Sequence, residues 1–62
     1  MKISFLKRSQ GAKGEDYEAT ILSIDVSDSL PESIAVVQAI KQFEEYAGVN
    51  HWQQVADRYT IT

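Results

Sequence analysis

The chain has 62 residues, no cysteine, a single histidine and a formal net charge of −3. This length corresponds to one domain, residues 1–62, and so short a chain buries only about 60% of the surface that its unfolded form exposes. Without cysteine it has no disulfide, and one histidine is too few for a Cys/His cluster that binds structural zinc. We therefore expect association with a protein partner or a second copy as an additional source of stability.

The N-terminal ten residues, MKISFLKRSQ, contain an apolar run only from Ile3 to Leu6, and Ser4 interrupts it. A run this short is neither the core of a signal peptide nor a membrane span. We therefore expect a soluble protein with no membrane contact, located by default in the cytoplasm. The absence of cysteine agrees with a reducing compartment.

Charge is segregated along the chain. Four basic residues precede every acid, and these are Lys2, Lys7, Arg8 and Lys13. Six acids follow between Glu15 and Glu32 with no base among them. We expect paired strands that place opposite charges across from one another, and an acidic interaction face is the alternative. Nucleic-acid binding usually needs a basic patch and a high pI, so the acidic balance of the chain disfavours it.

Two strands joined by a turn are expected first. The segment from Met1 to Leu6 alternates between apolar and polar residues and predicts a strand with one buried face. The segment from Ser9 to Asp16 holds two of the three glycines and no large apolar residue, which is typical of a flexible turn. These glycines do not make a phosphate loop, since no Ser or Thr follows at the required place.

The segment from Tyr17 to Val26 predicts the second strand and an antiparallel hairpin with the first. Both of its faces are partly apolar, with Tyr17, Ala19 and Ile21 on one and Leu22, Ile24 and Val26 on the other. A bulge that shifts the register midway explains this pattern. The alternative is a second face that contacts a partner chain.

The segment from Ser29 to Gly48 predicts one long helix over residues 30–47. Ser29 followed by Glu32 has the spacing of a capping box. Pro31 falls in the first turn, where its missing N–H costs nothing. Gly48 can adopt the left-handed conformation that ends many helices.

One face of this helix is apolar and should be buried. It comprises Val36, Val37, Ile40, Phe43 and Ala47, with Leu30 at its edge. We expect Ile40 and Phe43 in the core. Ile34 projects nearer the polar side, where it either packs at a margin or contacts a partner.

The segment from Asn50 to Thr62 fits two patterns. Asn50 with Gln53 resembles a second capping box, and the residues from Trp52 to Tyr59 fit a short helix. The last four residues alternate as in a strand. We expect a strand over the end of the segment, and the earliest start that we expect for it is Trp52. A short helix is the alternative.

No catalytic, cofactor or metal site is expected. His51 is the only histidine and is interpreted as a boundary residue near the helix C-terminus. Acidic and hydroxyl side chains crowd the helix start, but they lack the spacing of a calcium-binding loop with its central glycine. A single layer of sheet and helix also offers little room for a concave site, so we do not expect an enzyme.

The candidate interaction surface consists of Tyr17, Ile34, Tyr46, Trp52 and Tyr59. Tyr and Trp are enriched at interface hot spots, and they are also ordinary boundary residues with an apolar body and a polar tip.

The expected fold is α+β, with the order β-β-α-β and a three-stranded sheet packed against one helix. A right-handed crossover from the second strand places the third on the other side of the first, which gives the strand order 2-1-3. The expected function is that of a small accessory or regulatory protein that acts by protein–protein interaction, with a homodimer as one form. The alternative is a small nucleic-acid-associated regulator that uses Lys2, Lys7, Arg8 and Lys13.

Overall fold

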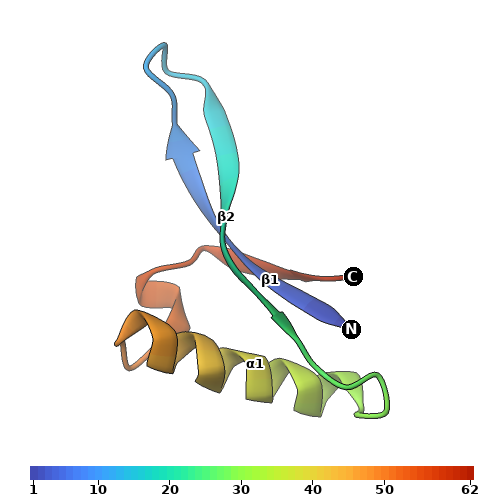
Figure 1. The fold of residues 1–62 in the computed structure, drawn as a ribbon. Helices are drawn as coiled ribbons and strands as arrows, with labels where there is room; N and C mark the ends of the chain where they lie inside the picture. The colour runs from blue at the N-terminus through green and yellow to red at the C-terminus, as the bar shows by residue number, and fades with distance from the viewer.

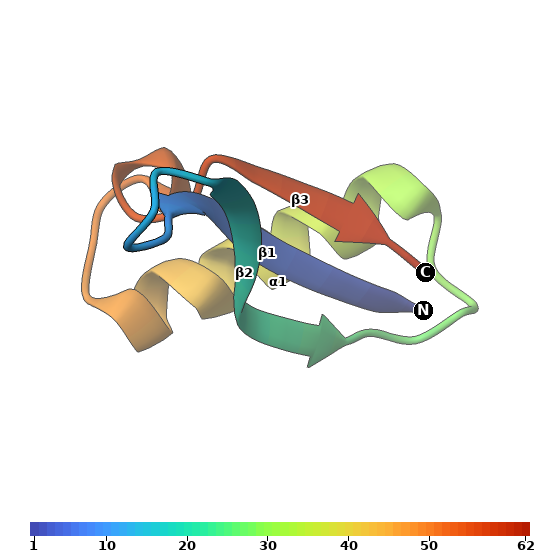
Figure 2. The ribbon, with the colours of Figure 1, turned by 90° about the horizontal axis from the view of Figure 1, so that it is seen from above.

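The computed structural model describes all residues from 1 to 62. Its elements in chain order are β1 (Lys2–Gln10), β2 (Asp16–Asp25), α1 (Glu32–Ala47), the 3-10 helix η1 (Trp52–Gln54) and β3 (Arg58–Ile61). Strands β2, β1 and β3 form one sheet in that order, and β1 is antiparallel to both neighbours. The predicted α+β fold and strand order are confirmed. Helix α1 crosses one face of the sheet (Figures 1 and 2), and no helix is both long enough and apolar enough to cross a membrane.

A β-bulge divides β2 into two halves. Phe5 is paired with Leu22, whereas the next residue, Leu6, is paired with Thr20, so Ile21 has no partner. The extra residue shifts the side-chain alternation by one place, and Tyr17 therefore lies on the same face as Leu22. The predicted bulge is confirmed, and it removes the apolar second face that would have pointed to a partner chain.

The face of the sheet away from α1 is consequently polar, apart from Leu6. Alternation along the paired strands places on it Lys2, Ser4, Arg8, Gln10, Asp16, Glu18, Thr20, Ser23, Asp25, Arg58 and Thr60.

The hairpin of β1 and β2 continues beyond the body of the domain as an arm, residues 7–20 (Figure 1). Strand β1 was expected to end at Leu6, but it reaches Gln10, and the turn is shorter than expected, with Gly14 at φ 83°. Neither α1 nor β3 accompanies the arm, and most of its side chains are exposed. The Cα radius of gyration is 12.7 Å, compared with about 11 Å for a compact domain of this length.

The start of α1 differs from the prediction. The helix begins at Glu32, with Pro31 as an extended N-cap residue (φ −56°, ψ 146°) and no side-chain cap. The predicted capping box is therefore wrong, and the hydroxyl of Ser29 lies 2.7 Å from that of Ser27 instead. A residue before proline is disfavoured in the helical region, so Leu30 cannot form the first turn that a Ser29 cap requires. The predicted end is confirmed, since Gly48 is left-handed (φ 69°, ψ 33°).

The buried face of α1 is rotated from the predicted one. Its fully buried residues are Ala35, Ala39 and Phe43, whereas Val37 is 52% exposed. Ile40, expected in the core, is only partly buried and packs against it. The helix therefore packs against the core along two short alanine side chains. The prediction from the apolar pattern gave more weight to the larger valines than to the alanines. It therefore rotated the predicted buried face away from Ala35 and Ala39.

The core lies between α1 and the inner face of the sheet. Its seven buried residues are Ile3, Phe5, Ile24, Ala35, Ala39, Phe43 and Ala56. At its centre the rings of Phe5 and Phe43 stack with centroids 4.2 Å apart and planes 12° from parallel.

The C-terminal segment contains a short helix and a strand, and each is shorter than its sequence suggested. Residues Trp52–Gln54 form a 3-10 helix, and the strand begins only at Arg58, so a strand that starts near Trp52 is wrong. The cap of η1 is His51 and not Asn50, because the His51 Nδ1 accepts a hydrogen bond from the Gln53 N–H at 3.1 Å.

Candidate interaction site at the hairpin arm

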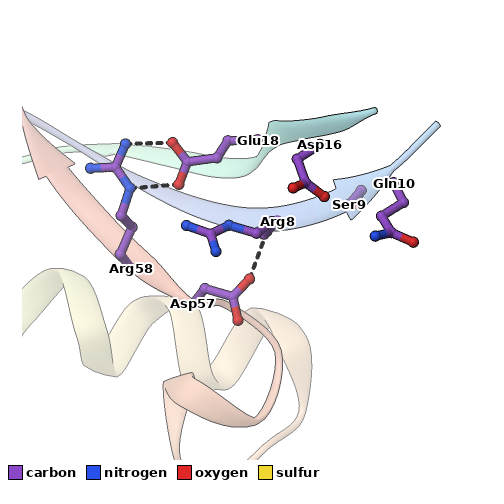
Figure 3. A pocket seen from close by; sticks show the side chains of 7 residues that line it. All are labelled: Arg8, Ser9, Gln10, Asp16, Glu18, Asp57 and Arg58. Carbon is purple, nitrogen blue, oxygen red and sulfur yellow. Dashed lines mark hydrogen bonds and ion pairs between the residues drawn. The ribbon is translucent and has the colours of Figure 1, made fainter. Parts of the chain in front are cut away.

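An open polar hollow lies on the outer face at the base of the arm (Figure 3). Its volume is about 520 Å³, and its lining residues are Arg8, Ser9, Gln10, Asp16, Glu18, Asp57 and Arg58. The sequence predicted little room for a concave site. The hollow exists because β3 begins opposite Leu6, whereas β1 continues for four more residues alongside β2 alone.

Glu18 and Arg58 form a bidentate ion pair across β1. The Arg58 guanidinium donates from Nε to Oε2 of Glu18 and from Nη2 to Oε1 (Figure 3). These hydrogen bonds hold the pKa of the Glu18 carboxyl below its usual value; desolvation opposes the shift, and the charges of Arg58 and Arg8 add to it. The same pair raises the pKa of Arg58. The pair therefore joins the first residue of β3 to the arm segment of β2.

Asp57 ends the pairing of β1 with β3. Its backbone N–H donates to the Leu6 carbonyl at 2.8 Å, and its carboxylate Oδ2 accepts from the Arg8 N–H at 2.6 Å. The Arg8 backbone amide is thus capped, but no carboxylate oxygen lies within 4 Å of the Arg8 guanidinium. Asp16 likewise has no cation within this distance.

The pH dependence of stability should reveal the ion pair. The pKa of Glu18 is lower in the folded chain than the ordinary value of 4.5, so its stabilising effect is present above pH 4.5 and is lost as the pH falls through the folded pKa. We expect Glu18→Gln to be less stable than the wild type at pH 7, with the difference disappearing on acidification. Urea unfolding at several pH values measures this. Thr20→Ala removes no ionisable group and is the control, so its difference in stability from the wild type should not depend on pH. If that difference also vanished in acid, the assignment to Glu18 would be contradicted.

Strand β2 has one edge without a neighbour, since it lies at the end of the strand order. In an antiparallel pair, alternate residues direct both backbone groups toward the partner strand. The Val26 N–H bonds the Met1 carbonyl at one end of the hairpin, and the Gly11 N–H bonds the Glu15 carbonyl at the other. From each of these bonds to the bulge, every second residue has the same direction. The residues whose backbone groups point away from β1 are therefore Asp16, Glu18, Thr20, Ser23 and Asp25.

Opposite charges do face each other across the hairpin, as predicted. Lys2 is paired in register with Asp25, and Arg8 with Glu18. The four basic residues nevertheless do not form one patch. Lys2 and Arg8 lie on the outer face at opposite ends of β1, Lys7 lies on the inner face, and Lys13 is in the turn.

The five predicted interaction residues are not brought together. Tyr17, Ile34 and Tyr46 are 51%, 47% and 67% exposed and lie on the arm, near the start of α1 and near its end. Trp52 and Tyr59 contact each other, with ring centroids 5.6 Å apart, and pack against the core. Only Tyr17 lies at the hairpin arm.

The sequence did not identify the residues that line the hollow. The run of acids was the one visible signal, but it does not show that Glu18 reaches Arg58, 40 positions later, across an intervening strand.

Comparison of the chain with protein-family models, with curated proteins and with solved structures found no match.

Proposed function

We propose that the protein acts by protein–protein contact, and that the outer edge of β2 receives an extended segment of the partner as an additional strand. The observation that carries the proposal is the ten-residue length of this edge strand, with five residues whose backbone groups point away from β1. Backbone hydrogen bonds to such an edge supply affinity, and alternate side chains supply specificity.

Long exposed edges usually carry protection against pairing, such as proline, charged side chains, a β-bulge or a covering element, and β2 has a bulge and three acids. The sequence of β2, DYEATILSID, contains neither proline nor lysine. The bulge at Ile21 leaves the residues from Asp16 to Thr20 as a regular stretch, and every residue in it is exposed. The arm therefore offers an accessible edge that the domain body does not cover.

Proline substitutions on either side of the strand test the proposal. The Thr20 N–H points outward, so Thr20→Pro blocks a bond to an added strand and leaves the β1–β2 ladder intact. With a partner captured from the host lysate and then purified, we expect Thr20→Pro to weaken binding by about tenfold or more, the equivalent of one or two backbone hydrogen bonds. Thr20→Ala, which keeps the N–H, should bind as the wild type does.

Ala19→Pro is the second control, because the Ala19 N–H points toward β1 and its loss should disrupt the arm itself. Proton NMR spectra should show a folded arm in Thr20→Pro and an altered one in Ala19→Pro. Wild-type affinity in a folded Thr20→Pro variant would exclude strand addition at this edge.

A second copy of the chain is the other partner class, and β3 is the edge better suited to it. Strand β3, RYTI, has no carboxylate, so antiparallel pairing of two β3 strands places no acids together. Sedimentation over a range of micromolar concentrations tests this form of association. A monomer mass at every concentration would exclude self-association, and the proposed contact would then be with a different protein.

A further inference from the structure

We propose that the segment received by β2 is basic, with lysine or arginine at alternate positions and apolar residues between them. This inference rests on the proposed strand addition and names the chemistry of the partner.

The outward-pointing residues of β2 also carry their side chains on the outer face of the sheet. Three of the five are acids, namely Asp16, Glu18 and Asp25. Arg58 pairs with Glu18, and Lys2 lies opposite Asp25 in register, although neither Asp16 nor Asp25 has a cation within 4 Å. The sequence also contains no lysine or arginine between Lys13 and Lys41. The edge therefore presents acids and no base of its own, and Asp16, at the arm end, faces the uncharged Gln10 rather than a base.

An added strand would place its own outer-face side chains beside these acids. Side chains directly opposite each other in neighbouring strands lie about 5 Å apart, so opposite charges attract and like charges repel at this distance. Lysine or arginine in the partner segment would pair with Asp16 and Asp25, whereas glutamate or aspartate there would be repelled.

The intervening positions of an added strand would meet the other face of the arm. Tyr17 and Ala19 lie there and are exposed, the former to 51%. The Tyr17 ring presents an apolar surface that an aliphatic side chain can cover. The edge therefore favours a segment in which basic and apolar residues alternate.

The same charges disfavour a second copy of β2 as the occupant. Antiparallel pairing over the whole strand would place Asp16 beside Asp25, and pairing centred on the arm would place Glu18 beside Glu18. Like charges directly opposite each other destabilise a strand pair. The acidic residues of β2 therefore favour a partner of different sequence over a second copy of β2.

Peptide titrations test the inference. The probes are a fluorescein-labelled nonapeptide of alternating lysine and valine that begins and ends with lysine, a glutamate–valine counterpart, and the lysine peptide N-methylated at alternate residues along either edge. We expect the lysine peptide to bind about tenfold more tightly than the glutamate peptide, as two cross-strand charge pairs would give. Backbone amide shifts in NMR spectra should centre on Asp16, Glu18 and Thr20.

A charge reversal supplies the matched control. The variant Asp16→Lys alters an exposed side chain that lies opposite the uncharged Gln10, and it should shift the preference toward the glutamate peptide. Methylation of the edge that faces β2 should abolish binding, whereas methylation of the other edge should be tolerated.

Several results would overturn the inference: no binding of the lysine peptide, equal binding of both charges, or amide shifts centred on α1. Equal binding of all the methylated peptides would also overturn it, because attraction between charges, without backbone hydrogen bonds to β2, would then explain the binding. The β2 edge itself is judged separately by the Thr20→Pro variant with the captured partner. A failed peptide titration with a sensitive Thr20→Pro variant would reject only the basic chemistry.

Discussion

Replacing Phe43 by alanine should lower the free energy of unfolding by about 3–5 kcal/mol, the usual cost of removing a buried ring. Phe43 is fully buried, and its ring stacks on Phe5 with centroids 4.2 Å apart. It is the only aromatic residue that α1 contributes to the core. A domain of this length has a total stability of roughly 3–9 kcal/mol, so the variant should be largely unfolded at the lower end of that range.

Urea unfolding followed by Trp52 fluorescence measures the effect. Val37→Ala is the matched control, because Val37 lies on the same helix and is 52% exposed. Its stability should stay within about 0.5 kcal/mol of the wild type. A loss below about 1 kcal/mol for Phe43→Ala would place the buried face of the helix elsewhere.

Replacing Ala39 by leucine should destabilise the domain by about 1–3 kcal/mol through overpacking. Ala39 has no exposed surface and lies one turn from both Ala35 and Phe43, on the line where the helix approaches the sheet. A leucine there must push α1 outward or displace the core side chains around it. The physical cause is the opposite of that in Phe43→Ala, where a cavity is left.

Gln38→Leu is the control for Ala39→Leu, since it introduces the same side chain at the neighbouring, exposed position. Both variants are compared with the wild type by thermal and urea unfolding. Gln38→Leu should be close to neutral. Wild-type stability in Ala39→Leu would mean that the helix does not lie against the sheet at its alanines.

The sequence predicted the topology because its strongest signals are periodic. Alternation identified the hairpin, the helical period identified α1, and the mixed faces of the segment from Tyr17 to Val26 indicated the bulge. Two local details failed for identifiable reasons. Pro31 prevented Leu30 from entering the helix, and the buried face of α1 includes the alanines at positions 35 and 39, whose small side chains contribute little to an apolar pattern.

The candidate site was predicted less well, because it depends on register. Large aromatic side chains drew attention to Trp52 and Tyr59, which the fold uses to cover Phe5. The direction of each backbone group of β2 depends on the bulge at Ile21 and on the bonds at both ends of the hairpin. The sequence also did not predict that β1 extends beyond Leu6, because residues 7–10 have no apolar pattern.

Amide hydrogen exchange in the free protein tests the open edge of β2 most directly. Measured residue by residue by NMR, exchange should alternate along the strand. The amides of Glu18, Thr20 and Ser23 should exchange rapidly because they face solvent, and those of Ala19 and Ile24 should be slower because they bond to β1. Equal protection of both sets would contradict the account, since the outer edge of β2 would then already be covered.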